Sequence, residues 1–220
     1  AKHLGSNADE VNKLNVFPVP DGDTGDNMYM TIGGGVDAIS DLRDADLSDV
    51  VEAFAHGMLL GARGNSGVIL SQFFSGVAKG LSPYKQANAQ IIAQSLQMGV
   101  EKAYKAVMTP TEGTILTVAR EAVEYTVAHV DEYESITELF FSLKEQMHSS
   151  LERTPELLTV LKEAGVVDSG GAGLLFIAEG FDKVLRGVEI ESAADDRLLT
   201  AKKPAVSFSA FTADSEMVYG

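Results

Sequence analysis

The sequence predicts an all-α fold, an up-and-down barrel or bundle of about eight helices, on the strength of three observations. Apolar residues recur at helical spacing along most of the 220 residues. Alternating patterns typical of strands are almost absent. The connections between the periodic stretches are short, which favours antiparallel neighbours. A composition of 45% hydrophobic and 22% charged residues fits a globular chain with a sizeable core.

Boundary residues support the individual helices. The run Gly33–Gly35 weakens the second helix by about 1 kcal/mol per glycine, or alternatively marks a close approach of another backbone. Ser48 caps the third helix, and Ser135–Glu138 is a capping box for the seventh. Pro155 restarts or kinks that helix before it stops at Gly165. The helical repeats occupy residues 2–13, 28–42, 48–61, 68–77, 92–107, 115–125, 139–165 and 174–185.

The end of the chain departs from this pattern. After Glu189 the charged residues give way to residues 205–211, a short alternating stretch typical of a strand. We therefore expect one helical domain over residues 1–187, and a linker with the start of a further domain over 188–220. The chain begins without Met and ends without a closing element, so we expect a fragment of a longer protein.

Charge and composition exclude several classes of function. The net charge of −15 argues against nucleic acid or an anionic membrane as partner. The sequence contains no cysteine, which excludes thiolate chemistry and fits a cytoplasmic protein. We find no signal peptide and no apolar run long enough to insert stably in a membrane. Phosphate chemistry in such a chain would depend on metal ions and backbone dipoles.

The most unusual stretch is the acidic turn, residues 15–27, which reads NVFPVPDGDTGDN. Its prolines exclude a helix, and three carboxylates follow within six positions, at Asp21, Asp23 and Asp26. So much like charge in a tight turn is costly unless a cation is bound, and hard oxygen ligands favour Mg²⁺, Mn²⁺ or Ca²⁺ over zinc. Plain helix capping is the alternative. An EF-hand is excluded because Gly25 stands where a ligand belongs.

Four connections rich in Gly, Ser, Thr and Asp precede the second, fourth, sixth and last expected helices. In an up-and-down bundle alternate helices point the same way, so these four N-termini gather at one end if the kink at Pro155 does not reverse the chain. Helix N-termini bind anions, and a carboxylate-held Mg²⁺ at the same end suits phosphoryl groups. The combination indicates a nucleotide triphosphate bound through metal. The connections are 21–26, 61–67, 111–114 and 168–171.

Taken singly, the last three of these connections are weak signals, since most such turns are only tight structural connections. Residues 61–67 lack the Lys-Ser/Thr pair of a P-loop and follow no strand. Neither a P-loop nor a dinucleotide-binding unit is supported.

Together the motifs resemble the N-terminal nucleotide-binding domain of the bacterial fatty acid kinase ATP-binding subunit. That domain is similar in turn to the ATP-binding subunit of dihydroxyacetone kinase. The likeness extends from about Ala1 to Leu185 and implies an eight-helix barrel that binds ATP or ADP with two Mg²⁺ ions at one mouth. The motifs are PVPDGDTGDNM (18–28), GARGNSGVILSQ (61–72), PTEGTILT (110–117) and VVDSGGAG (166–173).

The resemblance assigns site residues by position. Asp21 and Asp23 match the family's metal-binding aspartates, and Asn15 stands nearest to a further upstream aspartate as a neutral oxygen donor. Asp26 either adds a ligand or only lies at the helix N-terminus. The residues that match the nucleotide-contacting loops are Ser66, Gly67, Thr114, Asp168 and Gly170. To these we add Arg63 as a residue that neutralises phosphate charge.

The resemblance also implies a kinase that phosphorylates a fatty acid held by a separate fatty-acid-binding protein, giving an acyl phosphate. No side-chain nucleophile is expected, since positioning and charge neutralisation do most of this chemistry. A homodimer through domains outside this chain stays open. The alternatives are phosphotransfer to a small hydroxy-ketone such as dihydroxyacetone, and a non-catalytic binding module stabilised by metal.

Overall fold

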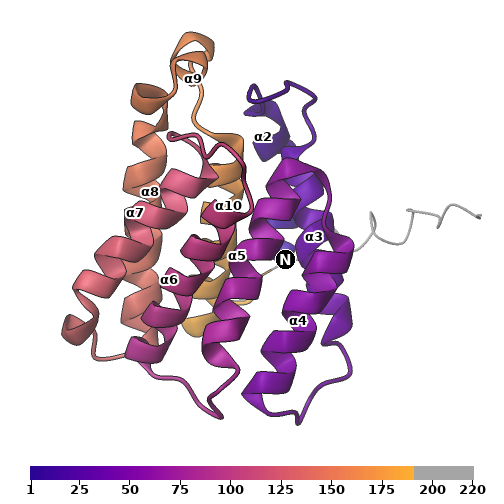
Figure 1. The fold of residues 1–220 in the computed structure, drawn as a ribbon, viewed down its shortest axis with the longest axis vertical. Helices are drawn as coiled ribbons and strands as arrows, with labels where there is room; N and C mark the ends of the chain where they lie inside the picture. Colours follow the sequence, from indigo (N-terminus) through magenta and orange to yellow (C-terminus); the bar gives the residue numbers. More distant parts are fainter. Residues whose placement is uncertain (191–220) are drawn as a thin grey trace, which may run out of the picture.

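The computed structural model describes residues 1–190, and this part of the chain contains ten α-helices and no strand (Figure 1). The predicted all-α class is therefore confirmed. None of these helices has the length and apolar character needed to span a bilayer. The stretch 205–211 and nearly all of the expected linker lie outside the described residues. The helices are α1 (Lys2–Ser6), α2 (Ala8–Lys13), α3 (Thr24–Ala38), α4 (Leu47–Gly61), α5 (Gly64–Leu81), α6 (Ala89–Lys105), α7 (Ile115–Ala128), α8 (Ile136–Leu157), α9 (Thr159–Ala164) and α10 (Ser169–Leu185), with a 3₁₀ turn at Val130–Glu132.

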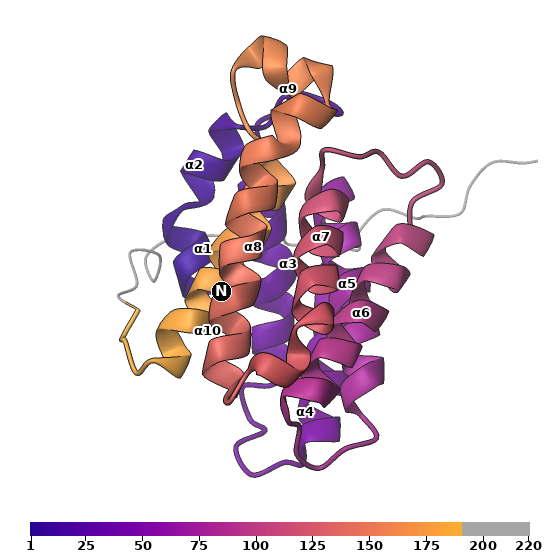
Figure 2. The same cartoon turned by 90° about the vertical axis from the view of Figure 1, so that its left-hand side faces the viewer.

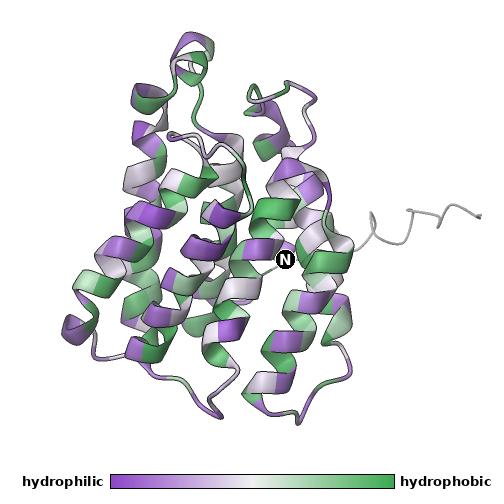
Figure 3. Cartoon of the chain, viewed as in Figure 1, coloured by the Kyte–Doolittle hydropathy of each residue, from purple (hydrophilic) through white to green (hydrophobic). Residues whose placement is uncertain are grey.

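The long helices run alternately up and down, and each packs mainly against its neighbours in the chain (Figure 1). α3, α5, α7 and α10 consequently begin at the same end of the molecule. α8 closes the barrel between α7 and α10, and α1 and α2 lie against α10 and α3 (Figure 2). The long helices carry both hydrophobic and hydrophilic residues, as Figure 3 shows. A single core of buried side chains results, with Met28, Met58, Leu70, Val118, Leu139 and Leu143 among its members.

Two of the expected helices are interrupted. The helix predicted over residues 2–13 breaks at Asn7, whose backbone (φ −112°, ψ 8°) leaves the helical region. Of the two readings of Pro155, a restart is wrong, because Pro155 lies inside α8 and the break falls at the extended Leu158. Pro155 has no N–H for the carbonyl of Leu151, but the Thr154 hydroxyl donates to that carbonyl at 2.7 Å. The helix continues for two residues past the proline, to Leu157.

The glycine run in α3 marks a close approach of backbones, the second of the two expected readings. A Cβ atom at Gly34 would lie 2.6 Å from the carbonyl oxygen of Gly57 and 3.2 Å from the Cα of Gly61, both in α4. A Cβ atom at Gly57 would collide with the Gly34 carbonyl oxygen. The two helices thus touch backbone to backbone, and only glycine fits at their crossing.

This crossing predicts opposite effects for two adjacent substitutions. Gly34→Ala is expected to lower the free energy of unfolding by about 1–3 kcal/mol, because the helices must separate. Gly33→Ala is the matched control, since a Cβ atom there would meet no atom of residues 1–190 within 4 Å. It is expected to raise the free energy of unfolding by up to about 1 kcal/mol through helix propensity alone. Urea unfolding of both variants measures the difference, and equal effects would contradict the close crossing.

Candidate functional site

A cleft of about 690 Å³ opens at the end of the barrel where α3, α5, α7 and α10 begin. Residues from all four connections line it, so the convergence expected from the sequence is confirmed as geometry. α8 runs toward this end of the barrel, and the short α9 lies just beyond it (Figure 1). The kink expected at Pro155 therefore does not reverse the chain, and α10 begins at the same end as α3, α5 and α7. The lining includes Asn15, Asp21, Asp23, Asn65, Ser66, Thr111, Thr114, Asp168, Ser169 and Gly170.

Three of the ten expected site residues are not among the residues that line the cleft. The exposed Arg63 turns its guanidinium back, donating to the carbonyl oxygen of Ala62 at 2.9 Å. Gly67 is buried, and a Cβ atom there would collide with the Thr31 hydroxyl, so this glycine lets α5 pack on α3. Asp26 is exposed and accepts a hydrogen bond from Asn12 at 3.0 Å.

The acidic turn presents two carboxylates to the cleft. Asp21 is exposed and Asp23 is half-buried, with Gly22 between them in the left-handed region (φ 69°). Within residues 1–190 no group of three or more His, Cys, Asp or Glu side chains is arranged to hold a metal ion. Two carboxylates nevertheless suit Mg²⁺, which keeps several waters and is usually bound by one or two carboxylates together with phosphate oxygens. The donors present fit Mg²⁺ held jointly with a phosphate ligand.

Asn15 lines the cleft, but its side chain is engaged within the turn. It is buried, its Oδ1 accepts the N–H of Gly22 at 2.8 Å and of Asp23 at 3.4 Å, and its Nδ2 faces two backbone carbonyls. These bonds close the turn around a single amide group. The role of Asn15 as a metal ligand stays a prediction.

The helices α10, α7 and α5 differ in how their N-terminal backbone N–H groups are satisfied at the cleft. Asp168 caps α10, accepting the N–H of Gly171 at 2.7 Å, and Thr114 accepts weakly from Leu116 at 3.4 Å at the start of α7. α5 begins at Gly64 (φ 58°), and no described side chain caps its first turn. Since Gly64, Asn65 and Ser66 line the cleft, the N-terminus of α5 is open toward it. An uncapped helix N-terminus attracts anions through its free N–H groups and dipole.

The carboxyl of Asp168 is the most perturbed acid among residues 1–190. Burial raises its pKa to about 6, although the backbone N–H groups of Gly171, Ile115 and Gly170 favour the charged form and limit the rise. The backbone N–H of Asp168 donates to the Thr154 hydroxyl at 3.1 Å. Asp168 thus ties together the starts of α7 and α10 and the end of α8.

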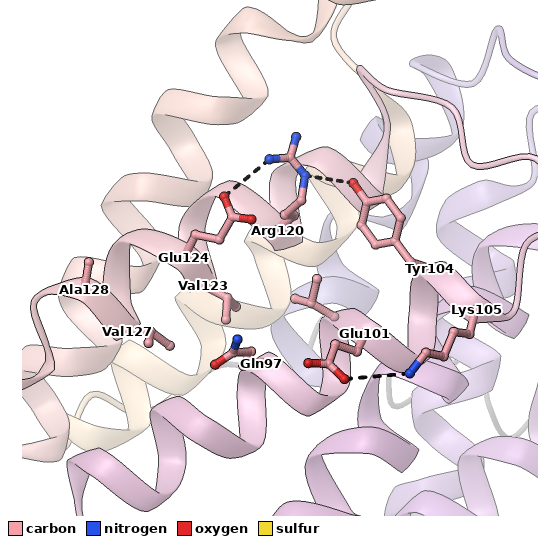
Figure 4. Close-up of a pocket in the computed structure, with 10 residues that line it drawn as sticks. Gln97, Glu101, Tyr104, Lys105, Arg120, Val123, Glu124, Val127 and Ala128 are labelled. Carbon is pink, nitrogen blue, oxygen red and sulfur yellow. Dashed lines mark hydrogen bonds and ion pairs between the residues drawn. The ribbon is translucent and has the colours of Figure 1, made fainter.

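A brace outside the cleft holds the loop before α7. Glu112 accepts hydrogen bonds from Thr117 at 2.6 Å and from Arg120 at 2.8 Å, and the Thr117 hydroxyl accepts the N–H of Gly113 at 2.8 Å. Burial alone would raise the pKa of Glu112, but these hydrogen bonds outweigh it and hold the pKa below its usual value. Figure 4 shows Arg120 in an open groove between α6 and α7, where it also bonds Tyr104 and Glu124.

The sequence motif 110–117 includes Glu112 and Thr117 without giving them this role, and Arg120 and Asn12 were missed. No local pattern reveals them, because Arg120 lies eight residues from Glu112 and Asn12 lies fourteen residues from Asp26. Helical periodicity places Arg120 on α7, but its partners become apparent only when α6 and α7 pack together.

The chain thus forms an all-α barrel with four helix N-termini and an acidic turn at one mouth, and the sequence comparison gives its family. The pattern of the DAK2 domain matches residues 18–183, and the chain belongs to this family. An "Uncharacterized protein" of Staphylococcus epidermidis is 51% identical over 194 residues, covering 88% of this chain and 35% of that protein. One from Staphylococcus aureus is 49% identical over 192 residues, with 87% and 35% covered. The chain thus spans about a third of the length of these relatives.

Solved structures agree with this assignment at the level of the fold. The dihydroxyacetone kinase from C. freundii in complex with AMP-PNP and Mg²⁺ superposes with a TM-score of 0.61 at 17% identity, covering 83% of this chain and 32% of that one. The native form of the same kinase gives a TM-score of 0.58 at 18% identity, with the same coverage. The DAK2 assignment makes this a kinase-related domain, and the nucleotide and Mg²⁺ belong to the C. freundii complex.

The pKa of Asp168 predicts a specific pH dependence of stability. Because its folded pKa of about 6 lies above the ordinary value of 3.8, protonation favours the folded state. The contribution is fully present below about pH 4 and is lost as pH rises to about 6, by at most about 3 kcal/mol. Asp168→Asn keeps the cap but cannot ionise.

Urea unfolding of both proteins between pH 4 and 7.5 measures this dependence. The free energy of unfolding of the wild type is expected to fall relative to Asp168→Asn as pH rises to about 6, and then to run parallel with it. A constant difference across the range would contradict the buried, protonated carboxyl.

Proposed function

We propose that this domain binds ATP or ADP through Mg²⁺ in the cleft, as the nucleotide-binding part of a kinase. The observation that carries the proposal is the open N-terminus of α5 and the carboxylates of Asp21 and Asp23 lining one cleft. The first offers N–H donors to phosphate oxygens, and the second offers oxygen ligands to the cation that phosphates bring with them. A site that combines an anion-binding helix N-terminus with cation-binding carboxylates suits a metal-bound polyphosphate better than it suits a free anion or a free metal ion.

The position of each residue in the cleft suggests which part of the metal-bound nucleotide it would contact. Asp21 and Asp23 hold the metal, Ser66 and the first turn of α5 hold phosphate oxygens, and Thr114 and Gly170 border the nucleotide. When bound, Mg²⁺ offsets the charge that develops on the transferring phosphoryl group. For Asp26 and Arg63 we propose no direct contact with the nucleotide, since they do not line the cleft.

We further propose that the acceptor is the carboxylate of a fatty acid held by a separate lipid-binding protein. The bond between the β,γ-bridging oxygen and the γ-phosphorus breaks, a bond from the carboxylate oxygen to that phosphorus forms, and acyl phosphate and ADP leave. Support comes from the sequence motifs, which resemble the fatty acid kinase subunit. The chain spans only 35% of its staphylococcal relatives, so a helical domain over residues 1–187 would act together with further domains.

Phosphotransfer to dihydroxyacetone is the second candidate, and the structural likeness to the C. freundii kinase favours it. Both candidates share the nucleotide site and differ in the acceptor and its carrier. A non-catalytic module would lack metal-dependent nucleotide binding altogether, or would bind without any acceptor being phosphorylated.

The nucleotide site predicts a metal-dependent thermal shift. ATP with Mg²⁺ is expected to raise the melting temperature of the domain by several degrees, since a ligand at 100 times its Kd contributes about 2.7 kcal/mol. Asp21→Ala and Asp23→Ala are each expected to abolish most of the shift. Asp41→Ala is the matched control, because this exposed aspartate follows α3 at its other end. A full shift in both site variants, or equal binding of ATP without metal, would refute the site.

If this domain binds the nucleotide while further domains and a lipid-binding protein supply the rest, acyl phosphate is expected to form only when all of these parts are present. The full-length protein with ATP, Mg²⁺ and a fatty-acid-loaded carrier is expected to produce acyl phosphate, detected as hydroxamate. The domain alone with free fatty acid is expected to produce none above background. Full-rate turnover by the domain alone would contradict the proposal, and phosphorylation of dihydroxyacetone in place of the fatty acid would favour the second candidate.

A further inference from the structure

The acidic turn is built on two asparagine side chains instead of regular backbone pairing. Asn12, in the last turn of α2, uses its Oδ1 to accept the N–H of Gly25 at 2.7 Å and, more weakly, of Asp26 at 3.3 Å. Its Nδ2 donates to the Asp26 carboxylate at 3.0 Å. A single amide thus caps the first turn of α3 from another helix, where Asp23 at the N-cap position makes no capping bond of its own.

Asn15 plays the same part for the residues just before α3, because its Oδ1 accepts the N–H groups of Gly22 and Asp23. Between them the two amides accept four backbone N–H groups, those of Gly22, Asp23, Gly25 and Asp26. A helix N-terminus and a tight turn are the places where backbone donors otherwise lack partners. The conformation that presents Asp21 and Asp23 to the cleft therefore depends on these side chains.

Packing leaves the turn little freedom to adjust if an amide is lost. Gly25 is buried, and a Cβ atom there would collide with the carbonyl oxygen of Ala8 at the start of α2. The start of α3 is thus pressed directly on the backbone of α2, as the adjacent ribbons in Figure 1 show. Asn12 lies on the same short helix, so α2 acts as the support on which the acidic turn is fixed.

We propose that Asn12 is a positioning residue for the metal-bound nucleotide, acting through the acidic turn; this inference rests on the proposed function. Its own side chain does not line the cleft. By fixing the first turn of α3 it sets where the carboxylates of Asp21 and Asp23 stand relative to one another. A group that orients metal ligands in this way typically changes metal affinity by about 10–100-fold when it is removed.

A matched pair of asparagine variants separates positioning from simple capping. Asn88 caps α6 by accepting the N–H of Ile91 at 3.0 Å, and it does not line the cleft. Asn12→Ala and Asn88→Ala each remove one helix cap and are expected to lower the melting temperature of the ligand-free domain by a similar few degrees. Mn²⁺ binding in the presence of saturating AMP-PNP, followed by electron paramagnetic resonance, then reads the metal site directly.

Asn12→Ala is expected to weaken Mn²⁺ binding at least about tenfold, and Asn88→Ala to leave it within about twofold of the wild type. The double variant N12D/D26N reverses donor and acceptor across the 3.0 Å bond at unchanged net charge. It keeps an acceptor for the N–H of Gly25, and it is expected to bind Mn²⁺ within about threefold of the wild type. Rescue by this exchange is not expected of a residue that only stabilises the fold.

Asn12→Gln keeps the amide but moves it by one methylene. If Asn12→Ala fails to fold, this variant tests whether Asn12 positions the metal ligands. It is expected to weaken Mn²⁺ binding at least about threefold while its circular dichroism matches the wild type. Wild-type affinity in either single variant would overturn the inference and leave the proposed function standing. If the wild type itself fails to bind Mn²⁺ with AMP-PNP, the proposed function falls and this inference falls with it.

Discussion

Antiparallel packing of long helices through short connections is the constraint on which this molecule depends. It forces α3, α5, α7 and α10 to begin at one end, and the donors of four helix N-termini are gathered there. Asp168, Thr114 and Asn12 satisfy part of this demand, while the first turn of α5 has no side-chain cap among the described residues. The cleft is thus the place where the barrel concentrates positive backbone potential, although the chain carries a net charge of −15.

The acidic turn balances this potential and also adds a cost of its own. Asp21 and Asp23 repel one another in the absence of a cation. The turn nevertheless keeps its shape because the Oδ1 atoms of Asn12 and Asn15 accept the backbone N–H groups of Gly25 and Gly22. A metal-bound polyphosphate would satisfy both features together, since its oxygens suit α5 and its cation suits the carboxylates. Stability and the proposed binding are therefore coupled through one short segment.

Much of the architecture could be predicted because helical periodicity is local. The repeat from Val68 to Val77 and the turn chemistry before it were enough to place α5 and its start at the cleft. The breaks at Asn7 and at Leu158 were missed, since each depends on neighbours that the repeat does not encode. The same holds for Asn12, whose partner lies fourteen residues away, and for Arg63, whose side chain turns back on its own backbone. The composition of the loops was enough to predict the cleft, whereas the side chains that hold the loops in place, such as Asn12, could be identified only from the packed structure.

A crystal structure of the domain with Mg²⁺ and AMP-PNP tests the central claim most directly. The account predicts phosphate oxygens on the N–H groups of Asn65 and Ser66, with the metal bridging those phosphates to the carboxylates of Asp21 and Asp23. Nucleotide bound elsewhere on the barrel, or bound in the cleft with the acidic turn free of metal, would contradict it.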